Sequence, residues 1–218
     1  SVWDRLISPI ESSRIAKKSE LKDLVHYTNY SALEGIVQAR NIWFSLVSEM
    51  NDTSEIIAGK EIIESLGDDG NPASAPFLAI REHDPQTWGL MSDVFRHRKN
   101  WDHKNTFVSC WSNCNTEYGS HDDLMMWRTY GNEGNGVAMV IDWEAFLDNP
   151  AHKDELSFFP VFDETTDDFI VRCTEQFNHF SSLWLSLSRD IYDAHRDVAV
   201  RAFSQLVFIL AVSHKDKS

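Results

Sequence analysis

The segment Leu24 to Thr28 places a histidine, a tyrosine and a threonine at the end of a predicted β-strand. A histidine there offers one hydrogen-bond donor and one acceptor, which suits the two hydroxyl groups of a ribose. Tyr27 and Thr28 add an aromatic ring and a hydroxyl group that could approach the same ligand. The alternative is that His26 only bonds a backbone carbonyl. His26, Tyr27 and Thr28 are therefore the first candidate ligand site.

A second candidate group follows further along the chain. Trp43 and Ser45 belong to a predicted strand, and Asn51 and Asp52 lie in the polar loop behind it. The two loop residues could line a ligand site, or they could only shape the turn and cap the next helix. Glu55 falls in the first turn of that helix, where the helix dipole favours a carboxylate in any case.

A third group lies on a predicted helix over 121–130. Trp127 and Tyr130 are three residues apart, so they share one face of that helix. This face could stack on a planar ring, or Trp127 could belong to the core. Gly131 then breaks the chain before the apolar run 136–141, which is typical of a central strand.

The three cysteines, Cys110, Cys114 and Cys173, follow no disulfide framework. We expect reduced thiols without a disulfide, and we expect Cys110 to be buried in a strand. Cys110 and Cys114 could join His103 and His121 as metal ligands, but their spacing is not that of a zinc site, so no metal is expected. The sequence contains no nucleophile elbow, P-loop or dinucleotide-binding glycine motif.

The 218 residues carry 20 lysines and arginines against 34 aspartates and glutamates, a formal net charge of −14. Such a charge repels phosphate backbones and argues against broad non-specific nucleic-acid binding. The longest late apolar stretch, 206–212, is too short to cross a bilayer. Nothing at the N-terminus resembles a signal peptide. With few cysteines, these features predict a cytoplasmic protein without membrane contacts.

Hydrophobic periodicity predicts short strands that alternate with short helices, followed by a long helical region. The expected strands are 24–28, 42–46, 106–112 and 136–142, with a further one near 158–162. One helix is expected after the capping residues Asn29 and Ser31, and a second from Thr53 to about Leu66. Further helices are expected at 85–99, at 121–130 and over most of 166–212. This order indicates the α+β class, with small central sheets and flanking helices. We expect one domain, 1–218, with an α+β core at 20–162 and a helical part at 163–218.

Six stretches, in this order, resemble a bacterial family of uncharacterised proteins, DUF2971. The stretches are 25–28, 42–45, 50–55, 107–112, 126–131 and 136–142. The set is specific as a group, whereas each stretch alone is not. This resemblance by itself implies little about function.

A more distant likeness concerns function. The His-Tyr-Thr strand, the capped helix and the next small-residue strand look like the opening of ADP-ribosyltransferases, including DNA-modifying toxins. The likeness implies that the first-strand histidine holds a ribose of NAD, that an aromatic residue stacks on nicotinamide, and that a glutamate completes the site. His26 and Thr28 would then hold NAD, with Trp43 or Tyr130 as the aromatic wall and the segment 45–51 close by.

The sequence departs from the pattern of the family that it resembles at the expected glutamate. Family members usually carry a late strand with a Glu-x-Glu motif, and this sequence stops at Ser218, where we expect that strand to begin. Glu55 is therefore the candidate catalytic carboxylate, since a carboxylate stabilises an oxocarbenium-like transition state. The leading hypothesis is an NAD-binding, ADP-ribosyltransferase-like domain of a toxin or phage-defence system. The alternatives are a protein-interaction domain, with Trp127 and Tyr130 docking a partner, and a nucleotide sensor without catalysis.

Overall fold

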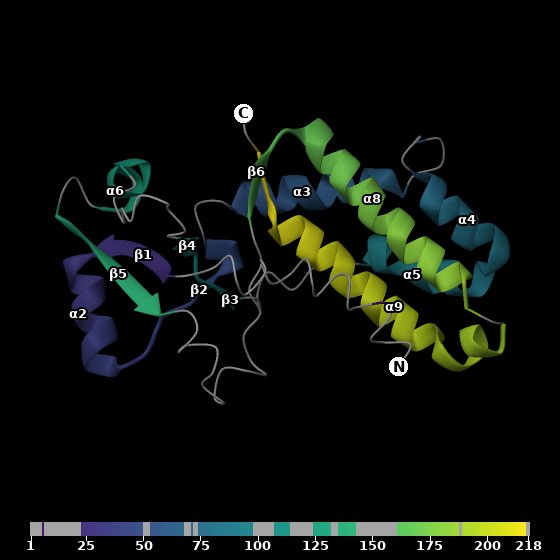
Figure 1. Ribbon diagram of the computed structural model, residues 1–218, viewed down its shortest axis with the longest axis horizontal. Coiled ribbons are helices and arrows are strands. Elements are labelled where there is room, and N and C mark those ends of the chain that lie inside the picture. Colours follow the sequence, from purple (N-terminus) through teal and green to yellow (C-terminus); the bar gives the residue numbers. More distant parts are fainter. Residues whose placement is uncertain are drawn as a thin grey trace. The chain divides into compact units, whose positions relative to one another are not determined.

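The chain forms two compact units (Figure 1). Unit 1 consists of Ser1–Ile15, Met50–His103 and Phe158–Ser218, and unit 2 consists of Ala16–Glu49 and Lys104–Ser157. The computed structural model describes residues 6, 23–49, 53–67, 71, 74–97, 107–113, 124–131, 135–142, 161–187 and 189–216. Unit 1 is mainly helical and unit 2 is built around a small antiparallel sheet, so the predicted α+β class is confirmed. The expectation of a single folding domain stays a prediction.

The main sheet of unit 2 is antiparallel, with the strand order β4-β1-β5. β1 (Asp23–Asn29) pairs along its whole length with β5 (Gly136–Asp142). On its other edge, β1 pairs with β4 (Ser112–Asn113). The predicted strands at 24–28 and 136–142 are therefore confirmed. β1 is the central strand and β5 lies at the edge of the described sheet, so the prediction of a central strand at 136–141 is wrong.

Two helices of unit 2 accompany this sheet, α2 and α6 (Figure 1). α2 (Tyr30–Ala39) begins at Asn29, whose side-chain oxygen accepts a 2.8 Å hydrogen bond from a backbone N–H of the first turn. The predicted cap Asn29 is therefore confirmed, whereas Ser31, the other predicted cap, lies inside the helix. α6 (Leu124–Tyr130) ends at Gly131, where a Cβ atom would lie 2.3 Å from the Trp127 carbonyl oxygen. Only glycine fits that close approach, which explains the break predicted there.

A second sheet of unit 2 has two strands, β2 (Ser45–Leu46) and β3 (Phe107–Val108). The 3-10 helix η1 (Val47–Glu49) follows β2 directly. The predicted strand at 42–46 is therefore real but shorter than expected.

The predicted strand at 106–112 is wrong in extent, because it is two short strands. β3 pairs with β2, whereas β4 pairs with β1, so residues 109–111 pass from one sheet to the other. Cys110 lies in this connection and is exposed. The prediction of a buried Cys110 is therefore wrong: the apolar alternation suggested one continuous strand, and the change of pairing partner interrupts it.

Unit 1 is a helical body. Its helices are α3 (Thr53–Leu66), α4 (Ala75–His83), α5 (Pro85–His97), α8 (Thr166–Leu185) and α9 (Arg189–Val212). The predicted helices in 53–66, 85–99 and 166–212 are confirmed, whereas α4 was not predicted. At the end of α9, β7 (His214–Asp216) pairs in parallel with β6 (Phe162–Glu164).

The core of unit 1 is rich in aromatic side chains. It includes Ile63, Leu66, Phe77, Ile80, Met91, Phe169, Phe177, Phe180, Trp184, Phe203 and Leu206. The rings of Phe77 and Phe177 are 4.7 Å apart, centroid to centroid, and they join α4 to α8. Each fully buried side chain of this size stabilises the fold by about 1.5–3 kcal/mol.

Asp84 is a buried charge beside this core, and it precedes the first residue of α5. Its carboxylate accepts a 3.3 Å hydrogen bond from the Thr87 backbone N–H, and another bond from the Thr87 hydroxyl group. The indole N–H of Trp184 donates a third bond of 3.3 Å. Arg196 Nε lies 3.6 Å from the same carboxylate. These partners compensate for the removal of the charge from water.

Candidate functional site

His26 lies in the middle of β1, whereas the sequence analysis expected it at the end of the strand. Its Nδ1 is 3.0 Å from the carbonyl oxygen of Cys110. Because a carbonyl oxygen only accepts hydrogen bonds, Nδ1 must carry the proton, and Nε2 is then the acceptor of the neutral imidazole. The alternative interpretation, a histidine bonded to a backbone carbonyl, is thus present in the structure, and it defines which nitrogen could meet a ligand.

The indole of Trp111 packs beside the imidazole of His26. The two ring centroids are 5.0 Å apart and the planes are inclined by 39°. The indole is held in turn, because Trp111 Nε1 donates a 3.1 Å hydrogen bond to the Ser109 hydroxyl oxygen. Ser109 and Trp111 belong to the stretch 107–112 that resembles DUF2971, but nothing in the sequence indicates that they lie beside His26.

Alternation along β1 separates the three residues of the His-Tyr-Thr motif. His26 and Thr28 share one face of the strand, and both side chains are half-buried. Tyr27 points to the opposite face and is 5% exposed. Its ring meets Trp127 of α6 edge to face, with 5.1 Å between the centroids. A ligand at His26 would therefore contact Thr28 rather than Tyr27. The ring of Trp127 packs against Tyr27.

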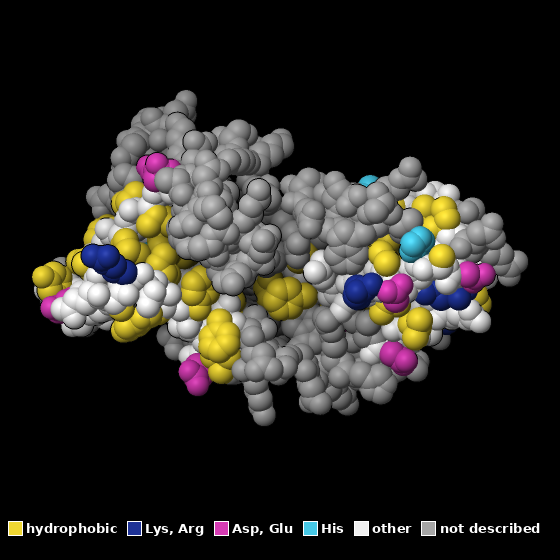
Figure 2. Space-filling view, turned by 90° about the horizontal axis from the view of Figure 1, so that it is seen from below, with side chains coloured by type: hydrophobic (Ala, Val, Ile, Leu, Met, Phe, Trp, Pro, Cys, Tyr) yellow, Lys and Arg dark blue, Asp and Glu magenta, His cyan; other side chains and the backbone are white. Residues whose placement is uncertain are grey.

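The other aromatic candidates of unit 2 are more open. Trp43 is 60% exposed, and its ring rests on α2, where a Cβ atom at Gly35 would come within 3.1 Å of the indole. Tyr130 is 42% exposed at the end of α6, and Ser45 is exposed in β2. Figure 2 shows hydrophobic side chains, in yellow, reaching the surface in this part of the protein. Glycine at position 35 is what allows the indole to approach the helix backbone so closely.

Three further candidates from the sequence are only partly placed. Asn51 and Asp52 lie outside the described residues. Glu55 belongs to the first turn of α3 in unit 1, and the structure describes its backbone but not its side chain. The ligand roles of Asn51 and Asp52 and the catalytic role of Glu55 stay predictions.

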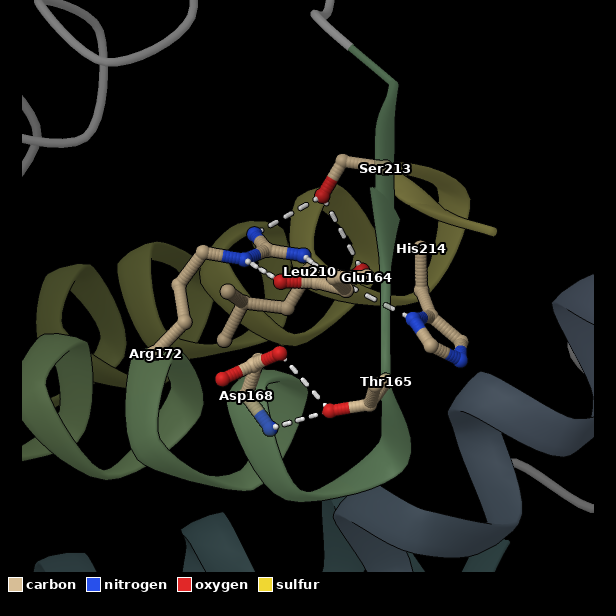
Figure 3. A network of polar contacts seen from close by, with 7 residues as sticks. All are labelled: Glu164, Thr165, Asp168, Arg172, Leu210, Ser213 and His214. Carbon is tan, nitrogen blue, oxygen red and sulfur yellow. Dashed lines mark hydrogen bonds and ion pairs between the residues drawn. The ribbon is translucent and has the colours of Figure 1, made fainter. Parts of the chain in front are cut away.

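A polar network in unit 1 was not predicted (Figure 3). Glu164 of β6 accepts two hydrogen bonds from the guanidinium of Arg172 in α8, one of 3.0 Å from Nε and one from Nη2. Arg172 Nη1 donates a third, of 3.1 Å, to the Ser213 hydroxyl oxygen. His214 Nδ1 lies 3.3 Å from the same Glu164 carboxylate. The network therefore ties β6, α8 and the start of β7 together.

The environment of this network is largely apolar. The imidazole of His214 stacks on Phe169 at 4.1 Å, and its side chain is 1% exposed. The guanidinium of Arg172 lies 4.4 Å from the centre of the Phe162 ring. A charged pair in such surroundings needs its full set of hydrogen bonds, which the bidentate geometry supplies. Opposite charges eight residues apart, across a strand-to-helix turn, are a weak signal that could have suggested the pair.

Cys173 follows Arg172 on the buried face of α8. Burial raises the pKa of its thiol from 9.0 to about 12, an increase that the nearby Arg172 charge opposes and the Glu164 charge reinforces. A thiol in this environment stays protonated and is a poor nucleophile. Cys173 is therefore a core residue, not a reactive group.

Metal ligation and membrane insertion find no structural counterpart in the described part of the chain. No three His, Cys, Asp or Glu side chains come together there as a metal site. Of the four residues considered as ligands, His103, Cys114 and His121 lie outside the described ranges. None of the described helices combines the length and the apolar character that crossing a membrane requires.

Comparison with known proteins returned no match, whether with protein-family models, with curated proteins or with solved structures. The resemblance to the DUF2971 family and the likeness to ADP-ribosyltransferases therefore stay predictions.

Proposed function

We propose that unit 2 is an ADP-ribosyltransferase-like module that binds NAD or a related nucleotide, with a ribose hydroxyl group at His26. The observation that carries this proposal is the oriented imidazole. The Cys110 carbonyl oxygen accepts a hydrogen bond from Nδ1–H, so Nε2 presents an acceptor to a ligand hydroxyl group. The Thr28 side chain lies on the same face and adds a second polar group, as the two hydroxyl groups of a ribose require.

An exposed aromatic ring supports the same proposal. Nucleobases and nicotinamide are planar, and stacking on an aromatic side chain contributes about 1–3 kcal/mol per base. Trp127 is packed against Tyr27, whereas Trp43 keeps 60% of its surface exposed. Trp43 is therefore the better of the two tryptophans for stacking.

Calorimetric titration of the full chain with NAD tests the proposal. We expect His26→Ala to weaken binding by about 0.5–1.5 kcal/mol, the net value of one hydrogen bond. This corresponds to roughly a two- to tenfold increase in Kd. His179→Ala is the matched control, because His179 is an exposed histidine of α8 in unit 1. The control should bind NAD as the unmodified protein does.

Two results would count against the proposal. One is the absence of any binding at millimolar NAD, and the other is unchanged binding in His26→Ala. Binding without release of nicotinamide would support a nucleotide sensor instead of an enzyme.

A protein-interaction domain is the second candidate function. The observation that favours it is the number of large apolar side chains that unit 2 exposes, among them Tyr30 at 66%, Trp43 at 60% and Phe107 at 59%. Exposed apolar groups of this size occur at protein interfaces. Failure of NAD binding, together with self-association or partner binding that Trp43→Ser abolishes, would favour this alternative.

A further inference from the structure

The short connection between β3 and β4 surrounds one side of His26. It contains only Ser109, Cys110 and Trp111. The backbone carbonyl of Cys110 accepts a hydrogen bond from His26 Nδ1–H, and the Trp111 indole packs on the imidazole, with 5.0 Å between the ring centroids. The Ser109 hydroxyl group accepts the indole N–H at 3.1 Å. Cys110 and Trp111 thus contact His26 directly, and Ser109 contacts Trp111.

The strand register explains why this connection meets His26. β1 and β4 pair Leu24 with Asn113 and Val25 with Ser112. Continued by one residue, the antiparallel register places Trp111 opposite His26, on the same face of the sheet. The ladder stops there, so the backbone of the connection can turn its Cys110 carbonyl toward the imidazole. The contact is therefore a consequence of where the strand ends.

We infer that Ser109 and Trp111 are positioning residues that hold His26 as its Nδ1–H tautomer, and that the ligand group at Nε2 is a hydroxyl donor and not a phosphate. The nature of the ligand rests on the proposed function, whereas the positioning does not. An unprotonated Nε2 and a phosphate oxygen are both acceptors, so they share no proton and repel each other. A ribose hydroxyl group, in contrast, donates to Nε2.

Long-range proton–nitrogen NMR spectra of the full chain test this inference, because they report which imidazole nitrogen carries the proton. The His26 signals are assigned by their loss in His26→Gln. We expect one tautomer in the unmodified protein, with the proton on Nδ1. Trp111→Leu should give a mixture of tautomers, and Ser109→Ala should give a smaller change in the same direction. Cys110→Ala is the matched control, because it keeps the carbonyl and should leave the tautomer unchanged.

Backbone amide spectra establish whether each variant is folded. If Trp111→Leu does not fold, the milder substitution Ser109→Ala still tests the positioning role. NAD should shift the His26 Nε2 signal, and dimethyl phosphate, an ionised phosphodiester that carries no hydroxyl proton, should not. A proton on Nε2 in the unmodified protein, or an unchanged tautomer in both folded variants, would overturn the positioning roles. A phosphate-induced shift of Nε2 would overturn the ligand class. A fixed Nδ1–H tautomer with no response to NAD would remove the proposed function and leave the positioning residues in place.

Discussion

His26 shows how a single contact decides what a residue can do. The carbonyl of Cys110, 84 residues away in the chain, selects its tautomer. Every residue carries a backbone carbonyl, so this partner has no signature in the sequence. The imidazole is thereby changed from a group with two possible roles to an oriented acceptor, and the ligand chemistry that we propose for unit 2 rests on that change.

Cys173 provides a prediction at the same scale. Its thiol keeps its proton in the folded protein up to about pH 12, whereas the unfolded chain loses it above pH 9.0. Between these values the folded state binds more protons, so the free energy of unfolding falls as the pH rises, by up to about 1.4 kcal/mol per pH unit. Urea unfolding at several pH values in this range measures the free energy of unfolding. We expect this free energy to fall more steeply with pH in the unmodified protein than in Cys173→Ala. Identical slopes in the two proteins would contradict it.

The elements of unit 1 are joined by a part-buried polar network as well as by the apolar core. Glu164 and Arg172 connect β6 to α8, and Ser213 and His214 attach β7. The Glu164 and Arg172 side chains are 11% and 20% exposed. Removal of one partner from such a pair leaves an uncompensated charge in apolar surroundings. A two-residue contact therefore affects the packing of three elements.

Two arginines of unit 1 form ion pairs that differ in burial. Their substitution tests whether the burial of a pair determines how much it stabilises the fold. Arg172→Met should lower the free energy of unfolding by about 3 kcal/mol, because it leaves the Glu164 carboxylate in apolar surroundings with His214 as its remaining partner in the network. Arg201→Met is the matched control, since Arg201 pairs with Asp197 at 2.6 Å but the two side chains are 66% and 70% exposed. An exposed pair contributes less than about 1 kcal/mol. Urea unfolding followed by far-ultraviolet circular dichroism measures both, and equal losses would show that the network adds no stability of its own.

The whole molecule carries a net charge of −14, which affects any anionic ligand. NAD has two phosphate groups, so the protein repels it at long range. Salt shortens the screening length from about 30 Å at 0.01 M to about 8 Å at 0.15 M. We expect NAD to associate several-fold faster at the higher ionic strength.

Stopped-flow fluorescence at the two salt concentrations measures this rate, with adenosine as an uncharged control that should respond little. A nucleic-acid-binding protein shows the reverse trend, because salt weakens its phosphate contacts. NAD association that slows with salt would therefore point to a local basic site that dominates over the net charge.

The sequence by itself determined the elements with strong local signals. The alternation in 24–28 and 136–142 predicted two strands, and the helical spacing in 166–212 predicted α8 and α9. Asn29 and Gly131 marked a helix start and a helix end, because a capping side chain and a missing Cβ act within a few residues. These features need no knowledge of distant parts of the chain.

Only the tertiary structure decided which segments meet. It paired β1 with β5, more than a hundred residues later, and it divided the predicted strand at 106–112 between two sheets. It also packed Tyr27 against Trp127 and built the network of Glu164, Arg172 and His214. Periodicity tells which residues of a segment share a face, but the partner of that face is set by long-range packing and hydrogen bonding. The orientation of His26 belongs to this second class, because it depends on where another strand ends.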